Sequence, residues 1–202
     1  MTLPNKLTML RILLIPVMIV LCYIPWLKEN MIFLNVSWLY FLLLIIFAIA
    51  SFTDFLDGKI ARKYNLITTF GKFADPLADK ILVFAAMVII MVGPYKHYLP
   101  DGLLPKGILL PVWVFVLILI REFVVSGIRM VAAVNGEAIA AGMSGKLKTV
   151  VTMIAIIVLF ICGLHDSLIY IGQILIYIAT ILTVISGIEY FIKGKKYILE
   201  SI

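Results

Sequence analysis

Four of the six aspartates in the chain lie in one stretch and are spaced as on helices: Asp54, Asp57, Asp75 and Asp79. On a helix, residues three or four positions apart share a face, which applies to the first two and to the last two of these aspartates. Two antiparallel neighbouring helices would therefore direct four carboxylates at one spot.

Four neighbouring carboxylates cannot all ionise unless cations compensate their charge. Hard oxygen ligands without histidine or cysteine favour Mg²⁺, Mn²⁺ or Ca²⁺ over zinc, and Mg²⁺ often shares its coordination sphere with substrate phosphates. The pattern therefore indicates phosphoryl-group chemistry. Two divalent ions could polarise the phosphate under attack and neutralise the leaving phosphate, while one carboxylate takes a proton from an incoming hydroxyl.

Small residues lie among the acids, including Gly58, Ala61 and Gly71. They would let a ligand approach the helix backbone closely, although helix packing explains them equally well. The alternative for each aspartate is a charge solvated at the level of the lipid headgroups or paired with a nearby lysine or arginine. Four acids at helical spacing beside an apolar bundle favour a functional site, because ionisable groups there are costly.

Long apolar stretches surround these acids and must position them. Of the 202 residues, 64% are hydrophobic and 14% are charged, against about a quarter charged in a soluble domain, which excludes a soluble globular fold. No alternating polarity of the kind found in barrel strands is present. We expect an all-α fold: one domain, residues 1–202, forming an integral membrane bundle of six transmembrane helices. The six charge-free stretches lie at 12–27, 31–53, 81–95, 107–120, 149–164 and 167–188.

The basic residues predict the orientation of this bundle. Of the 17 lysines and arginines, only Lys28, Lys96 and Lys106 would fall on one side of the membrane. Because basic residues accumulate on the cytoplasmic side, both termini are expected to be cytoplasmic. The net charge of +6 then needs no nucleic acid, for which no basic-aromatic module is present. Anionic membrane lipids or a phosphorylated substrate are the expected partners.

The complete pattern D-x2-D-G-x2-A-R-x8-G-x3-D-x3-D, from Asp54 to Asp79, resembles the signature of the CDP-alcohol phosphotransferases. The resemblance implies a six-helix enzyme of the cell membrane, usually a homodimer, with its active site at the cytoplasmic face. Such an enzyme transfers a phosphatidyl or phosphoalcohol group from a CDP-linked donor to a hydroxyl and releases CMP. It implies that Asp54, Asp57, Asp75 and Asp79 bind a pair of metal ions, Mg²⁺ or Mn²⁺, that Asp79 is also the general base, and that Gly58, Ala61, Arg62 and Gly71 line the nucleotide pocket.

The N-terminal segment has two readings. It contains Asn5, Thr8 and Arg11 before the first apolar stretch. Thr8 could simply cap a helix, and Arg11 could simply mark topology. The same N-x2-T-x2-R spacing is similar to the family's element that helps to hold the nucleotide, which makes these three residues candidates for the nucleotide site.

A second group of cations follows the fourth apolar stretch. Arg121 and Arg129 are about two turns apart on a helix, and Lys146 and Lys148 follow in a Gly-Lys-x-Lys-Thr segment. Arg121 and Glu122 could form only an interfacial pair. An acceptor phosphate would match the four cations. The arrangement is similar to the branch of the family that uses CDP-diacylglycerol as donor and sn-glycerol 3-phosphate as acceptor.

Two alternatives remain open from the sequence. A related enzyme could use another acceptor, such as serine, an inositol phosphate or phosphatidylglycerol; a neutral acceptor would leave the second group of cations without a phosphate partner. A divalent-cation transporter could use the aspartates as its ion site. Transporter sites usually lie near the bilayer midplane, however, whereas these acids follow the end of an apolar stretch.

The metal hypothesis leads to a first prediction. Excess chelator is expected to abolish transfer by the purified protein, because the carboxylates require cationic compensation, and added Mg²⁺ or Mn²⁺ is expected to restore it. The measurement is CMP release before and after chelation. Full turnover in excess chelator would exclude a metal-dependent reaction.

Overall fold

The computed structural model describes residues 3–63, 69–93, 108–134 and 142–200. Helices dominate these residues, as the apolar composition predicts. The elements in chain order are α1 (Leu3–Leu21), α2 (Pro25–Glu29), β1 (Met31–Phe33), β2 (Val36–Ser37), α3 (Trp38–Lys63), α4 (Thr69–Val92), α5 (Val112–Val134), α6 (Met143–Phe160), the short 3₁₀ helix η2 (Cys162–Leu164) and α7 (Asp166–Glu200).

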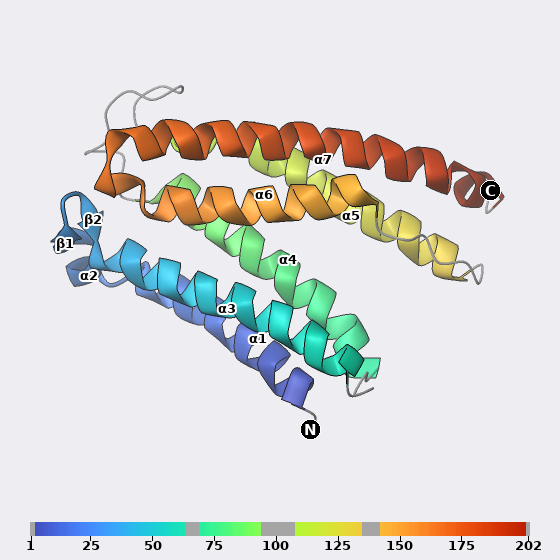
Figure 1. The fold of residues 1–202 in the computed structure, drawn as a ribbon, viewed down its shortest axis with the longest axis horizontal. Coiled ribbons are helices and arrows are strands. Elements are labelled where there is room, and N and C mark those ends of the chain that lie inside the picture. Colours follow the sequence, from blue (N-terminus) through green and yellow to red (C-terminus); the bar gives the residue numbers. More distant parts are fainter. Residues whose placement is uncertain (1–2, 64–68, 94–107, 135–141, 201–202) are drawn as a thin grey trace.

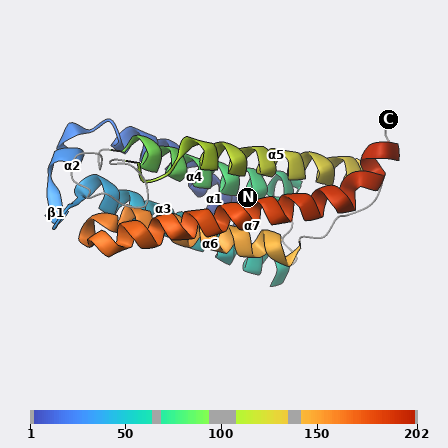
Figure 2. The same ribbon diagram turned by 90° about the horizontal axis from the view of Figure 1, so that it is seen from above.

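The long helices form two groups of three. Helix α1 packs mainly against α3 and α4, and α7 packs mainly against α6 and α5. Weaker contacts of α3 with α6, and of α4 with α5 and α6, join the two groups. Figures 1 and 2 show the long helices running lengthwise beside one another, with the β1–β2 hairpin at one end.

The two ends of the described chain both point away from the hairpin. Figure 1 shows the start of α1, the end of α3, the start of α4 and the end of α7 directed away from it. The connection between α3 and α4 therefore brings the acidic residues of both helices to the same end as the N-terminal segment.

Aromatic side chains fill the centre where the two groups meet. Tyr40, Phe47 and Phe160 are fully buried. The ring of Phe160 from α6 lies 6.1 Å, centroid to centroid, from each of the two α3 rings. Burying such side chains is the main favourable term in helix packing, so these contacts hold the relative position of α3 and α6.

Apolar side chains also cover much of the outer surface. Large exposed apolar residues include Leu13, Val20, Phe123 and Ile192, each more than 60% exposed. Soluble proteins rarely expose so much contiguous apolar surface. In the described part of the chain, two helical segments are long and apolar enough to cross a membrane, Met143–Phe160 and Asp166–Lys195. These observations indicate a membrane protein, and the number of six spans stays a prediction.

The structure corrects the expected end of the first apolar stretch, 12–27, and the expected start of the second, 31–53. Residues 31–37 form a two-stranded antiparallel hairpin, not helix, so the described fold is not purely α-helical. Its turn contains Leu34 in the left-handed region, with φ 44°. Helix α1 ends at Leu21, and Pro25 begins α2. Proline lacks a backbone N–H and is favoured at the first position of a helix, which explains the new start at Pro25.

Candidate active site

Helix α1 holds both helices that carry the acids. Arg11 is fully buried, and its Nη1 lies 2.9 Å from Oδ1 of Asp54 on α3. Its Nε also donates a hydrogen bond of 3.4 Å to the carbonyl oxygen of Ala50. The buried hydroxyl of Thr8 donates to Oδ1 of Asp75 on α4. Arg11 and Thr8 therefore lie against the aspartates, with Asn5 buried one turn before Thr8.

Asp79 is the aspartate with the least satisfied carboxylate. Its Oδ1 is buried and has no hydrogen-bond partner among the described residues. Burial raises the pKa of Asp79 to about 6, and the charge of Asp54 adds to this rise. Burial also raises the pKa of Asp54, against the lowering effect of Arg11, while Asp75 adds a further rise. These carboxylates, which lie outside the charge-free stretches, therefore influence one another, and the effect of burial on their pKa outweighs that of the nearby cations.

The oxygen donors fit a hard divalent cation. The buried, unpartnered Oδ1 of Asp79 is an atom that a cation would satisfy. No group of three or more histidine, cysteine, aspartate or glutamate side chains is close enough to hold a metal within the described ranges. The side chain of Asp57 lies outside those described. The convergence of all four carboxylates on one ion therefore stays a prediction.

The remaining residues of the acidic motif lie at the helix ends. Asp57, Gly58, Ala61 and Arg62 belong to the last turns of α3, and their side chains are not among those described. Gly71 is buried near the start of α4. Their proposed role in binding a nucleotide is not tested by these positions.

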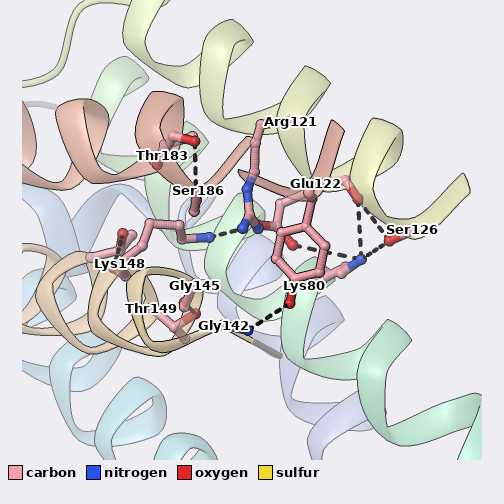
Figure 3. A network of polar contacts seen from close by, with 12 residues as sticks. Lys80, Arg121, Glu122, Ser126, Gly142, Gly145, Lys148, Thr149, Thr183 and Ser186 are labelled. Carbon is pink, nitrogen blue, oxygen red and sulfur yellow. Dashed lines mark hydrogen bonds and ion pairs between the residues drawn. The ribbon is translucent and has the colours of Figure 1, made fainter. Parts of the chain in front are cut away.

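The second group of cations surrounds the carboxylate of Glu122. From the sequence alone, Glu122 is expected only as a possible partner of Arg121. Glu122 Oε1 lies 2.7 Å from Arg121 Nη1 and 2.6 Å from Lys148 Nζ (Figure 3). Burial would raise the pKa of Glu122, but the charges and hydrogen bonds of Lys148 and Arg121 outweigh it and lower this pKa. The structure brings Arg121 and Lys148 together, while Arg129 and Lys146 are exposed.

Lys80 joins this cluster from the helix that carries Asp75 and Asp79. Its Nζ lies 3.6 Å from Oε2 of Glu122 and donates to the hydroxyl of Ser126 and, at 3.4 Å, to the backbone carbonyl of Glu122. The sequence indicated only that Lys80 marks topology or balances an acid. Its position directly after Asp79 was the one signal for a role in the site.

A small cavity connects the acids with the cations. It has a volume of about 60 Å³. Asp79 and Lys80 of α4 line it together with Glu122 of α5 and Lys148 of α6, and Thr149 and Thr152 lie beside Lys148. The carboxylates of Asp79 and Glu122 and the cations of Lys80 and Lys148 therefore face one space between the two groups of helices.

The contact between Thr8 and Asp75 leads to a second prediction. Thr8→Val is expected to lower the free energy of unfolding by about 1.5 to 3 kcal/mol, because it removes a hydrogen bond to a charged group without changing side-chain size. Denaturant titration of the protein in detergent micelles measures this change. The matched control is Thr180→Val, because the buried Thr180 hydroxyl bonds only within α7, to the carbonyl oxygen of Ile176. Equal losses in both variants would contradict a special role for Thr8.

The comparisons with known proteins identify the family of this chain. Residues 1–185 match the sequence model of the CDP-alcohol phosphatidyltransferase family. A Bacillus subtilis protein named CDP-diacylglycerol–glycerol-3-phosphate 3-phosphatidyltransferase is 40% identical over 169 residues, which cover 83% of this chain and 80% of that protein. Proteins of the same name from Rickettsia typhi (38% identity; 84% and 82% covered) and Escherichia coli K12 (33% identity; 76% and 73% covered) are also similar. The resemblance drawn from the aspartate motif is thereby confirmed, and the chain belongs to the CDP-alcohol phosphatidyltransferase family.

Proposed function

We propose that this enzyme transfers the phosphatidyl group of CDP-diacylglycerol to sn-glycerol 3-phosphate and thereby forms phosphatidylglycerophosphate and CMP. The observation that carries the proposal is the cavity shared by Asp79, Lys80 and Lys148. It would place an acceptor hydroxyl near a carboxylate and the acceptor phosphate near cations. The names of the similar proteins support the same pair of substrates.

In the proposed reaction, Asp79 accepts the proton of the acceptor hydroxyl. The hydroxyl oxygen forms a bond to the phosphorus of the phosphatidyl group, the bond from that phosphorus to the bridging diphosphate oxygen breaks, and CMP leaves. A carboxylate whose buried oxygen has no other partner is suited to receive that proton. Exclusion of water from the half-buried site would favour transfer to the acceptor over hydrolysis.

The aspartates would hold Mg²⁺ or Mn²⁺, as two ions. Asp54, Asp57, Asp75 and Asp79 are the proposed ligands, and the bound cations would supply positive charge to the diphosphate of the donor. The proposed nucleotide site adjoins them. Because Thr8 and Arg11 bind Asp75 and Asp54, they would connect the nucleotide site with the metal site. The proposed nucleotide-binding residues are Asn5, Thr8, Arg11, Gly58, Ala61, Arg62 and Gly71.

The proposed setting is the cell membrane. We propose a single domain, residues 1–202, that crosses the bilayer six times and functions as a homodimer, with both termini and the active site on the cytoplasmic side. The start of α1 and the end of α7 both point away from the hairpin, as the acid-carrying ends of α3 and α4 do, which supports this orientation (Figure 1). There the donor headgroup and a water-soluble acceptor can meet.

An acceptor panel tests the proposed function. Purified protein is incubated with CDP-diacylglycerol, Mg²⁺ and one labelled acceptor at a time, and CMP release is measured. We expect glycerol 3-phosphate to react and unphosphorylated glycerol to be a poor acceptor. Equal or faster reaction with serine, an inositol phosphate or phosphatidylglycerol would show that the acceptor is wrong. Absence of CMP release with every acceptor would contradict the transferase reaction itself.

Asp79 provides a third prediction. Asp79→Asn is expected to lower kcat by about 10²-fold or more, because the amide keeps the shape of the side chain but cannot accept the proton. Binding of CDP-diacylglycerol, measured separately at saturating Mg²⁺, should persist. The matched control is Asp166→Asn, an exposed position in the first turn of α7. Near-normal turnover of Asp79→Asn would remove Asp79 from the roles of base and metal ligand.

The four proposed phosphate-binding cations, Arg121, Arg129, Lys146 and Lys148, provide a fourth prediction. Lys148→Met is expected to raise the KM for glycerol 3-phosphate about tenfold or more with little change for CDP-diacylglycerol, because a charge-assisted contact is worth about 1.5 to 3 kcal/mol. Arg129→Ala should raise the same KM by less, since an exposed cation is screened by solvent. Steady-state kinetics with each substrate varied in turn measure both effects. Equal weakening of both substrates would contradict the assignment to the acceptor phosphate.

A further inference from the structure

We propose that Glu122 is the positioning residue of the acceptor phosphate site and that Lys80 is the third cation of that site. In this arrangement Glu122 holds Lys148 and Lys80, which line the cavity, and holds Arg121 on the same carboxylate oxygen as Lys148, next to the cavity. The inference rests on the proposed function, because it names the groups that prepare the site for a phosphorylated acceptor.

The geometry of Glu122 is that of a shared anchor. Its two carboxylate oxygens face cations from three helices: Oε1 faces Arg121 of α5 at 2.7 Å and Lys148 of α6 at 2.6 Å, and Oε2 faces Lys80 of α4 at 3.6 Å. The side chains of Glu122, Arg121 and Lys148 are 12%, 10% and 7% exposed. Burial of this degree limits screening by water, so the contacts with Arg121 and Lys148 restrict these two cations strongly, whereas Lys80 is 31% exposed and less restricted.

Neighbouring groups fix two of the cations further. The guanidinium carbon of Arg121 lies 5.5 Å from the ring centroid of Tyr190. Ser126 accepts from Lys80 and donates at 2.7 Å to the carbonyl oxygen of Glu122 (Figure 3).

The balance of charge matches a phosphate monoester. Three cations surround one carboxylate, which leaves two positive charges uncompensated within the cluster. A phosphate monoester carries about −1.5 to −2 charges at pH 7. The nearby Glu189 of α7 accepts from Ser144 at 2.6 Å and forms no ion pair with the three cations in the described part of the chain, and Asp79 also lines the cavity. The cluster would therefore favour a phosphorylated acceptor over a neutral one.

Positioning of the cations has a physical advantage over charge alone. Three like charges repel one another, and each long side chain carries about 2 kcal/mol of rotamer entropy that binding would otherwise have to remove. A central carboxylate removes both obstacles before the phosphate arrives, which is preorganisation of the site. Glu122 also repels the phosphate, so its presence is useful only if this positioning outweighs the repulsion.

Because positioning of the cations and repulsion of the phosphate change the KM for glycerol 3-phosphate in opposite directions, the direction of the change in a Glu122 variant distinguishes them. Glu122→Gln removes one negative charge and keeps the side-chain size. If charge alone governed phosphate binding, the KM for glycerol 3-phosphate would fall. If Glu122 positions the cations, that KM should rise about tenfold, with little change in the KM for CDP-diacylglycerol. Glu122→Asp, which restores the charge with a shorter side chain, should recover part of the loss.

Three controls keep the result interpretable. Glu189→Gln changes a neighbouring carboxylate outside the cluster and should leave the KM for glycerol 3-phosphate within about twofold of the parent value. Ser126→Ala is a milder variant that removes one of the three contacts of Lys80, together with the Ser126 bond to the Glu122 carbonyl, and should raise this KM by a smaller factor if Glu122→Gln fails to fold. Inorganic phosphate serves as a direct probe: its inhibition constant against glycerol 3-phosphate should rise in Glu122→Gln in parallel with the KM.

The outcomes separate this inference from the proposed function. If Glu122→Gln folds, an unchanged or lower KM and inhibition constant would overturn the inference. If Glu122→Gln does not fold, an unchanged KM in Ser126→Ala would overturn it. In both cases the transferase reaction stands. If the parent protein does not use glycerol 3-phosphate, the proposed function fails. In that case stabilisation of the parent by inorganic phosphate, measured as a thermal shift, should be lost in Glu122→Gln or reduced in Ser126→Ala. Equal stabilisation of parent and variants would then overturn the inference as well.

Discussion

The buried ion pair between Arg11 and Asp54 is the interaction on which the arrangement of the acids depends. A guanidinium cannot lose its charge in a protein, and a fully buried one requires a partner. Asp54 supplies that partner at 2.9 Å, and the pair ties α1 to α3. One turn earlier on α1, Thr8 binds Asp75 and ties the same helix to α4. Helix α1 therefore sets the distance between the two helices that carry the acids.

A second carboxylate has the corresponding role in the other half of the bundle. Glu122 connects α5 with α6 through Lys148, and α5 with α4 through Lys80. The acids of the first group and most of the cations of the second group therefore occupy separate elements. Lys80 is the exception, since it lies on the acidic helix and reaches the cationic cluster. Asp79 of α4 and Lys148 of α6 therefore line one cavity from different helices.

The sequence predicted the helices and the faces of the acids because both depend on local spacing. Apolar stretches indicated the long helices, and the four-residue spacing placed Asp75 and Asp79 on one face of α4, but the packing of α3 near α4 is what brings Asp54 close enough to influence both. Partners from distant helices have no such local signal. The contacts of Thr8 with Asp75 and of Lys80 with Ser126 join residues 67 and 46 positions apart. The hairpin at 31–37 was missed because its residues are apolar enough to continue a membrane stretch.

The three described aspartates differ in what already binds them, and this difference bears on their roles. Arg11 binds Asp54, and Thr8 binds Asp75, so each of these carboxylates has a donor that fixes its orientation. Asp79 keeps a buried oxygen without a hydrogen-bond partner in the described part of the chain, and it is the one aspartate among these three that lines the cavity beside Lys148. A fixed carboxylate is suited to hold a cation in place, whereas proton transfer requires an oxygen within reach of the acceptor. The contacts of α1 therefore favour Asp79 over Asp54 and Asp75 as the group that receives the proton.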